Sequence, residues 1–218
     1  QTPPTVLIVA PDSKSSASIL RSLAALKLSV FEIAAGGVLT CPISSAETLA
    51  HSAATVILLH YLALTPKELD QAILTLAPLE LPVIWSSVAD PLAWYSGRMT
   101  SPYAPSAIPR IDPAQFVALV EMQRDRARIV QEGLTRSRGV SIEIDGTTMG
   151  DEALSAIRRL LTFVPDFELK KDAKQTTTII EPDNLAELLN YLDRIGATML
   201  RDQIVASTQQ SAAVGGLQ

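Results

Sequence analysis

The 218-residue sequence contains one cysteine, Cys41, and two histidines, His51 and His60. One cysteine excludes an intrachain disulfide and a cysteine-based zinc site, and two histidines leave little for a histidine-based metal centre. No apolar run reaches the roughly 18 residues that a membrane-spanning helix needs. The residues therefore predict neither a metal nor a cofactor, and they predict no membrane span.

The scarcity of cysteine is also typical of a reducing compartment. The chain opens Gln1-Thr2-Pro3-Pro4, without the basic and then apolar segments that mark a secretory signal. On these two grounds we expect a cytoplasmic protein.

One basic cluster, within residues 124–138, is a candidate for binding nucleic acid. The net charge is −5 for the chain, zero over residues 1–139 and −5 over residues 140–218. A nucleic-acid surface needs clustered basic residues that neutralise phosphates. The basic stretch consists of Arg124, Arg126, Arg128, Arg136 and Arg138, interleaved with Glu121, Asp125 and Glu132. We interpret it as a salt-bridged solvent face and expect no nucleic-acid partner.

Continuous apolar runs alternate with helical patterns in the first 139 residues. Such runs are typical of parallel strands that are buried on both faces. Strands are predicted at 5–10, 30–34, 55–60 and 81–86, and helices at 15–28, 46–53 and 65–77, the last opening with a capping box. The alternation predicts an α/β fold, a doubly wound parallel sheet of flavodoxin-like or receiver-like type.

The pattern changes after the fourth predicted strand. A proline-rich segment at 88–110 holds a short helix at 92–97, and a long helix follows at 112–136. Beyond residue 139 we predict a strand at 140–144, a helix at 151–163, a strand pair at 167–171 and 176–180, a helix from Asp183 to Gly196 and a last helix at 197–206. These elements predict a receiver-like domain at 1–139, a small α+β domain at 140–206 and a disordered tail at 207–218.

Four segments of the first part resemble the response-regulator receiver domain. They are LIVAPDSKSSASILRSL (7–23), VILLHYLALTPKEL (56–69), LPVIWSS (81–87) and IDPAQFVALV (111–120), and the resemblance covers residues 5–125. It implies Mg²⁺-assisted phosphoryl transfer to an aspartate at the end of the third strand. This sequence departs from that chemistry, because Asp12 is the one acid after the first strand and His60 occupies the acceptor position. The family's lysine would fall at Ser101-Pro102, whereas its hydroxyl position is filled by Ser86 or Ser87.

With one carboxylate at the rim, a hard Mg²⁺ ion lacks its oxygen ligands. The resemblance therefore implies a pseudo-receiver, a non-catalytic regulatory or scaffolding module that binds another protein. We expect its interaction surface around Trp94, Tyr95 and Tyr103, and a possible homodimer through the long helix at 112–136.

Two alternatives remain open. Open α/β sheets bind ligands at the carboxyl ends of their strands, and a small-molecule or nucleotide sensor or enzyme would use that edge. The residues predicted there are Asp12, Ser13, His60, Ser86 and Ser87. The second alternative is a structural subunit of a larger assembly.

Overall fold

The computed structural model describes residues 6–12, 15, 30–33, 56–99, 110–136, 139–145 and 182–215. The chain divides into two compact units. We call residues 1–87 and 122–174 the sheet unit, and residues 88–121 and 175–218 the helical unit. Predicted elements that lie outside the described residues are the helices at 46–53 and 151–163, the strands at 167–171 and 176–180, and all but the first residue of the helix at 15–28.

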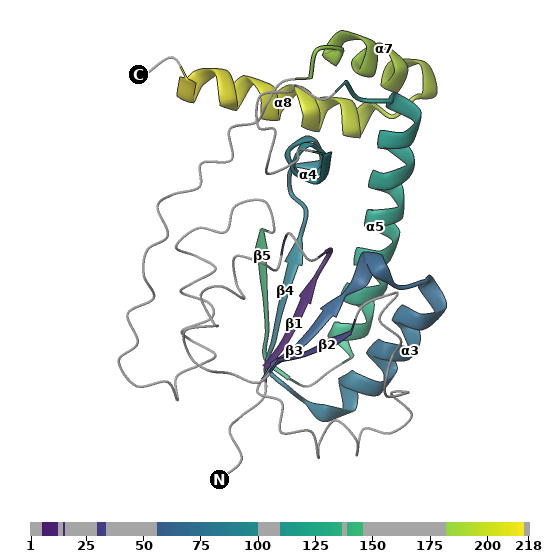
Figure 1. Cartoon of the computed structure of the whole chain (residues 1–218), viewed down its shortest axis with the longest axis vertical. Coiled ribbons are helices and arrows are strands. Elements are labelled where there is room, and N and C mark those ends of the chain that lie inside the picture. Colours follow the sequence, from purple (N-terminus) through teal and green to yellow (C-terminus); the bar gives the residue numbers. More distant parts are fainter. Residues whose placement is uncertain are drawn as a thin grey trace. The chain divides into compact units, whose positions relative to one another are not determined.

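Within the described residues, five strands form one sheet in which every neighbouring pair is parallel (Figure 1). They are β1 (Val6–Ala10), β2 (Val30–Ile33), β3 (Val56–His60), β4 (Val83–Ser87) and β5 (Ser141–Asp145). The first four lie where the continuous apolar runs predict buried strands. The predicted α/β class with a parallel sheet is therefore confirmed.

The order of the strands is β2-β3-β1-β4-β5. A flavodoxin-like sheet has the order 2-1-3-4-5, with β1 between β2 and β3. Here β3 lies between β2 and β1 instead, because its Val56 is opposite Val6 of β1 on one side and Val30 of β2 on the other. The flavodoxin-like detail is thus not confirmed. Apolar runs specify buried strands, but they do not say which strands pair.

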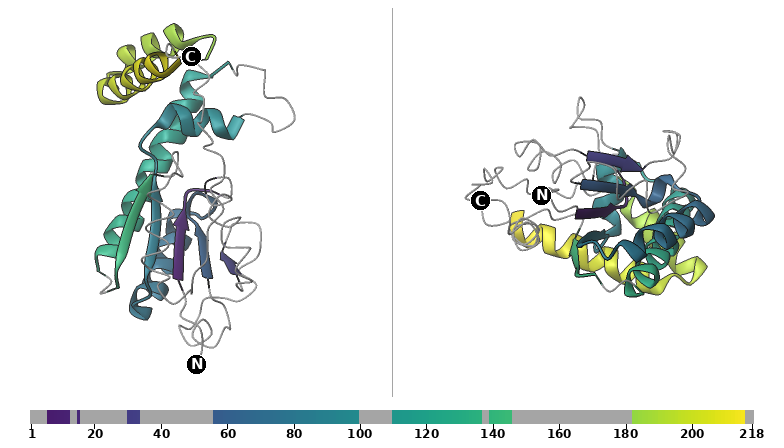
Figure 2. Two further views of the ribbon diagram at one scale, coloured as in Figure 1. Left: turned by 90° about the vertical axis from the view of Figure 1, so that its left-hand side faces the viewer. Right: turned by 90° about the horizontal axis from the view of Figure 1, so that it is seen from below.

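Both faces of the central strands are buried. One set of alternating residues, which includes Val9, Leu59 and Trp85, packs against helix α3 (Pro66–Leu76) and the later part of α5 (Pro113–Thr135) (Figures 1 and 2). The opposite set, which includes Ile8 and Leu58, is equally buried. Burial on both sides explains why these strands are continuously apolar rather than alternating.

Local signals fix the start and the packing of the helices on this sheet. The Thr65 hydroxyl accepts a hydrogen bond from Glu68 N at 3.3 Å, and a Glu68 carboxylate oxygen accepts one from Thr65 N at 2.8 Å. This confirms the predicted capping box of α3. On α5, a Cβ at Gly133 would lie 2.0 Å from Ile73 Cγ2, so α3 and α5 pack closely where glycine has no side chain.

The alternating pattern at 140–144 belongs to β5, the last strand in the order of the described sheet. β5 pairs with β4 from Ser141 beside Val83 to Asp145 beside Ser87. Ser141 and Glu143 are exposed, whereas Ile144 is buried. The division between the two units therefore does not fall at residues 139–140, which corrects the predicted boundary. Alternation marks a strand with one covered face, whether that strand completes one domain or begins the next.

The described part of the helical unit has no strand and is built from four helical segments. They are α4 (Pro91–Met99), the start of α5, α7 (Leu185–Ile195) and α8 (Thr198–Gly215). Helix α8 packs against α7 and α4. Asp90 caps α4 by accepting a hydrogen bond from Ala93 N at 2.9 Å, and its other carboxylate oxygen accepts one from the Ser207 hydroxyl of α8. Gly196 ends α7 with φ +75°, which confirms the predicted stop.

Helix α8 corrects the prediction of a disordered tail at 207–218. It continues through most of that segment and ends at Gly215. The segment contains Ala212 and Ala213, of the residue type with the highest helix propensity, and no proline. Its polar and small composition therefore allows a helix as readily as a coil.

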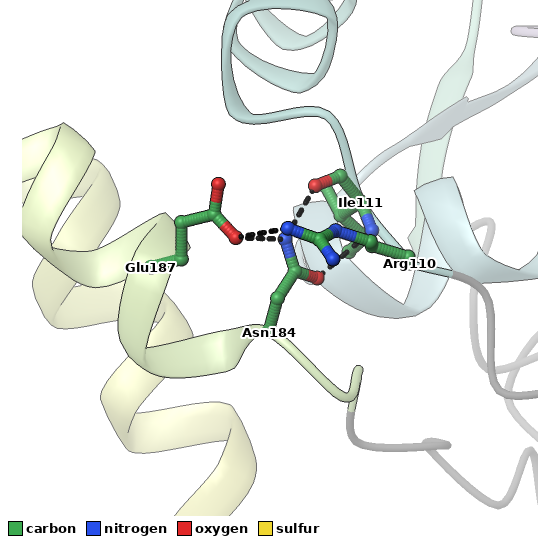
Figure 3. A network of polar contacts seen from close by, with 4 residues as sticks. All are labelled: Arg110, Ile111, Asn184 and Glu187. Atoms are coloured by element: carbon green, nitrogen blue, oxygen red, sulfur yellow. Dashed lines mark hydrogen bonds and ion pairs between the residues drawn. The ribbon is translucent and has the colours of Figure 1, made fainter.

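A polar network joins the start of α7 to the start of α5 within the helical unit (Figure 3). The Asn184 side chain accepts a hydrogen bond from Ile111 N at 2.9 Å and donates one to Ile111 O at 2.7 Å. Glu187 accepts from Asn184 at 3.2 Å and pairs with Arg110 at 3.0 Å. The N-cap position of α7 is thus Asn184 rather than the predicted Asp183, and its side chain binds Ile111 instead of capping the helix.

Candidate functional site

The carboxyl ends of the central strands bring two predicted site residues, His60 and Ser86, to one edge of the sheet. His60 lies beside Ala10, and Trp85 lies beside Val9. Continuing this register by one residue places Ser86 on the other side of Ala10. Residues of one row share a face of the sheet. His60, Ala10 and Ser86, which we call the rim row, therefore lie on the face opposite α3 and α5.

His60 is held by a residue that sequence reasoning missed. Its Nε2 lies 2.7 Å from Glu32 Oε1, and the two side chains are 3% and 56% exposed. Glu32 lies on the edge strand β2, opposite Leu58, so its side chain shares the face of the rim row. The only sequence signal for this pair was an acidic residue inside the short apolar strand VFEI.

Two buried polar atoms of the rim row have no hydrogen-bond partner among the described residues. They are His60 Nδ1 and Ser86 Oγ, which we call the two rim atoms. The residues are 2% and 1% exposed, and Ala10 between them is completely buried. A buried polar group without a partner costs roughly 1–3 kcal/mol. Two such groups in one row are therefore the least expected feature of the sheet.

A second polar network lies on the other face of the same strand ends. Gln123 of α5 donates a hydrogen bond to the Tyr61 hydroxyl at 3.1 Å, and that hydroxyl lies 3.5 Å from Ser86 O. Burial raises the pKa of Tyr61 above its ordinary value; the Gln123 bond lowers it, and the charge of Asp12 raises it further. The phenol therefore stays neutral and serves to tie β3 and β4 to α5.

Three other predicted site residues have different positions. Asp12 Oδ1 accepts hydrogen bonds from Ser15 N at 2.9 Å and from the Ser15 hydroxyl at 3.2 Å, so this carboxylate caps the chain segment after β1. Ser87 is half-buried, lies beside Asp145 in the register and falls one position past the rim row, on the opposite face. Ser13 lies outside the described residues. Within the part of the chain that the structure describes, no group of three His, Cys, Asp or Glu residues could hold a metal ion.

The aromatic residues predicted to form an interaction surface are core residues of the helical unit. Trp94 is 6% exposed and Tyr95 is 2% exposed. The Tyr95 ring meets Phe116 edge to face, with centroids 5.2 Å apart. This corrects the prediction for these two residues, because large aromatic side chains on a short helix supply the apolar area that a small helical core needs. Tyr103 lies outside the described residues.

The long helix also differs from its predicted use. Its apolar residues Phe116 and Val120 are buried in the helical unit, and Val130 and Leu134 are buried in the sheet unit. The exposed large apolar residues of the described chain are Leu74, Val140, Ile195 and Met199, none of which lies on α5. The stripe that suggested a homodimer is thus occupied within the chain, although self-association by another surface stays a prediction.

The arginine cluster of α5 has structural partners. Arg126 Nε donates to Leu64 O at 2.8 Å, and Arg128 pairs with Asp125 at 3.3 Å. Both contacts agree with a salt-bridged and packed helix face. Among the described residues, no helix combines the length and apolar character that crossing a membrane requires.

These features define the class as an α/β protein, in which the described strands form a five-stranded parallel sheet whose carboxyl edge holds buried polar side chains. The chain matches no protein-family model, and no curated protein or solved structure matches it.

Proposed function

We propose that this protein is a non-catalytic regulatory or adaptor module that acts by binding another protein. Two features of the sheet unit support a role without phosphoryl transfer. The residue at the acceptor position is His60, which is buried and bonded to Glu32. The one rim acid carried over from the resemblance, Asp12, is bonded to Ser15. Both side chains are therefore engaged in contacts that organise the fold.

The observation that carries the protein-binding role lies in the helical unit. Ile195 and Met199 flank the Gly196 turn between α7 and α8, and they are 46% and 78% exposed. Methionine is unbranched and polarisable, so it adapts to partners of different shape. We place the recognition surface at this turn, which we call the α7–α8 corner, in place of the buried pair Trp94 and Tyr95.

The proposal includes independence from phosphorylation, as in a pseudo-receiver, but it does not require receiver ancestry. The strand order 2-3-1-4-5 differs from the flavodoxin-like order. The receiver resemblance therefore stays a prediction drawn from four sequence segments. The proposed role depends on the contacts of His60 and on the exposure of the α7–α8 corner.

Matched charge substitutions test the recognition surface. Wild type, Met199→Glu and a control, Leu74→Glu on α3, are immobilised, and the proteins that each retains from an extract of the native source are quantified by mass spectrometry. Leu74 is also exposed, at 52%, but lies in the sheet unit. An apolar side chain buried on binding contributes about 1.5–3 kcal/mol, so Met199→Glu should weaken the specific partner about tenfold or more. Equal retention by Met199→Glu and wild type would refute the assignment.

A separate experiment tests the phosphorylation-independent part. The protein is treated with a small phosphoryl donor, and its intact mass is measured before and after mild acid. We expect no stoichiometric acid-labile adduct, because no aspartate occupies the acceptor position. A stoichiometric adduct that acid removes would refute the independence from phosphorylation. It would not bear on the recognition surface at the α7–α8 corner, which the preceding experiment tests.

A further inference from the structure

The two rim atoms lie on the same side of the sheet, and both are buried without a hydrogen-bond partner among the described residues. His60 and Ser86 are separated by one strand, so their Cα atoms lie roughly 9–10 Å apart. A serine side chain is too short to cross that distance to an imidazole. Between them stands Ala10, whose methyl group is the smallest side chain that an L-residue can place there. The rim row therefore has a polar side chain at each end, His60 and Ser86, and the small side chain of Ala10 between them.

The hydrogen bond to Glu32 determines the tautomer of the His60 imidazole. A carboxylate only accepts hydrogen bonds, so the proton shared with Glu32 is carried on Nε2. In the neutral ring, Nδ1 is then a bare acceptor that needs a donor. Ser86 Oγ carries a hydroxyl that both donates and accepts. One group that donates to Nδ1 and accepts from Ser86 satisfies both atoms.

A hydroxyl group has this pairing of donor and acceptor on one oxygen. An anion offers only acceptors to the Nδ1 lone pair and also approaches Glu32. An ammonium group has the donors but brings an additional charge into a buried row, which costs more than a neutral group. Through two hydrogen bonds of ordinary length, one oxygen joins two groups that are roughly 5–6 Å apart.

We propose that the rim row His60–Ala10–Ser86 is the polar floor of a binding site for a small neutral ligand that carries a hydroxyl group. Glu32 acts as a positioning residue, because it holds the imidazole in the tautomer that leaves Nδ1 as acceptor. This inference goes beyond the protein-binding role, and its failure is distinguishable from a failure of that role, because its test needs no partner protein and uses no residue of the α7–α8 corner.

The test uses the full chain and follows His60 directly. Only two histidines are present, so the ring nitrogen signals of ¹⁵N-labelled protein are assigned with the His51→Gln variant. Glycerol is the probe, with formate as an acceptor-only comparison and methylammonium as a charged donor. We expect glycerol to shift the His60 Nδ1 resonance saturably, with a weaker response to formate and to methylammonium.

Two serines that are adjacent in sequence provide the matched variants. Ser86→Ala should weaken the glycerol response about threefold to tenfold, the effect of one lost hydrogen bond. Ser87→Ala, on the opposite face, should leave it unchanged. If Ser86→Ala fails to fold, as judged by its thermal unfolding, Ser86→Cys replaces it, because a thiol is a weak donor of similar size.

Three results would overturn the proposal. The first is the absence of a saturable His60 response to glycerol. The second is an equal response in wild type and in the Ser86 variant. The third is a water molecule at His60 Nδ1, seen by magnetisation transfer from water and not displaced by glycerol, which would make the row a site for a resident water only.

Discussion

In the helical unit, the Asn184 side chain binds both backbone groups of Ile111, whereas in the sheet unit His60 and Ser86 each keep a buried atom without a partner among the described residues. The helical unit also contains two buried atoms of this kind, Ser96 Oγ and Arg201 Nε. Arg201 Nε, however, lies 2.8 Å from Asp193 Oδ1, so an ion pair compensates its charge even though the alignment is not that of a hydrogen bond.

The comparison separates polar groups that hold the fold from polar groups that the fold leaves available. Asn184 and Asp90 end in hydrogen bonds to backbone or helix caps, so their cost of burial is compensated inside the chain. The two rim atoms lie in one row at the edge where parallel sheets bind ligands. Clustering in one row, rather than the presence of an unpartnered atom by itself, distinguishes the sheet unit.

The largest expected effects test whether each unit depends on its own core. The chain has two tryptophans, Trp85 in the sheet unit and Trp94 in the helical unit, so Trp→Phe variants give one fluorescent reporter for each. Phe116→Ala should destabilise by about 3–5 kcal/mol. Its effect should be larger in the denaturant transition that Trp94 reports than in the one that Trp85 reports.

Leu59→Ala is the corresponding core variant of the sheet unit. Leu59 is completely buried under α3 and α5, and the expected cost is about 2–5 kcal/mol, larger at Trp85 than at Trp94. Leu74→Ala, at an exposed position of α3, is the control and should change little. Identical shifts at both reporters for both core variants would contradict separate cores and show that the chain unfolds as one block.

The next prediction compares the unfolding free energies of variants that lose a polar side chain in one unit or the other. Asn184→Ala removes both partners of the Ile111 backbone and should cost about 1–3 kcal/mol. Glu187→Ala, which loses an exposed ion pair, should cost less than about 1 kcal/mol. Without a bound ligand, Ser86→Ala should not destabilise the protein and should raise the unfolding free energy, by up to about 1–3 kcal/mol, because it removes a buried polar atom that has no partner among the described residues.

Urea unfolding of the three variants measures these free energies. The informative result is the difference between Asn184→Ala and Ser86→Ala. If Ser86→Ala proves as costly as Asn184→Ala, the Ser86 hydroxyl already has a partner in the free protein, and the contrast between the two units disappears.

Sequence reasoning succeeded where the signal is local. The capping box at Thr65 and the stop at Gly196 involve residues within four positions, and the structure has both. His60 and Ser86 could be placed on one edge because the carboxyl ends of parallel strands meet there. A continuous apolar run also indicates a buried strand, so the first four strands could be predicted from the sequence.

What could not be predicted depends on which distant segments pair. Glu32 is 28 residues from His60 and reaches it only because β2 pairs with β3. Gln123 is 62 residues from Tyr61 and reaches it because α5 covers that face of the sheet. The same limitation explains the misplaced domain boundary, since one apolar stripe along α5 serves both units and the sequence does not mark where its role changes.

The smallest expected effect compares the starts of two helices. In α7 the Asn184 side chain is diverted to Ile111, whereas in α3 the Glu68 carboxylate accepts hydrogen bonds from Thr65 N and from its hydroxyl. The backbone N–H of Thr65, followed by its hydroxyl, holds the pKa of Glu68 below its ordinary value of 4.5. Folding therefore favours the ionised form of Glu68.

A group whose pKa is lowered by folding contributes stability above its unfolded pKa and loses it as the pH falls through the folded value. Glu68→Gln keeps an acceptor oxygen but has no charge to titrate. The stability difference between wild type and Glu68→Gln should be constant above pH 4.5 and should narrow as the pH falls below that value. Thermal unfolding from about pH 6 to about pH 3 measures it, with Glu121→Gln on α5 as the control. A difference that stays constant over that range would mean that the Thr65 contacts do not favour the carboxylate, and that α3 and α7 begin without any electrostatic distinction between them.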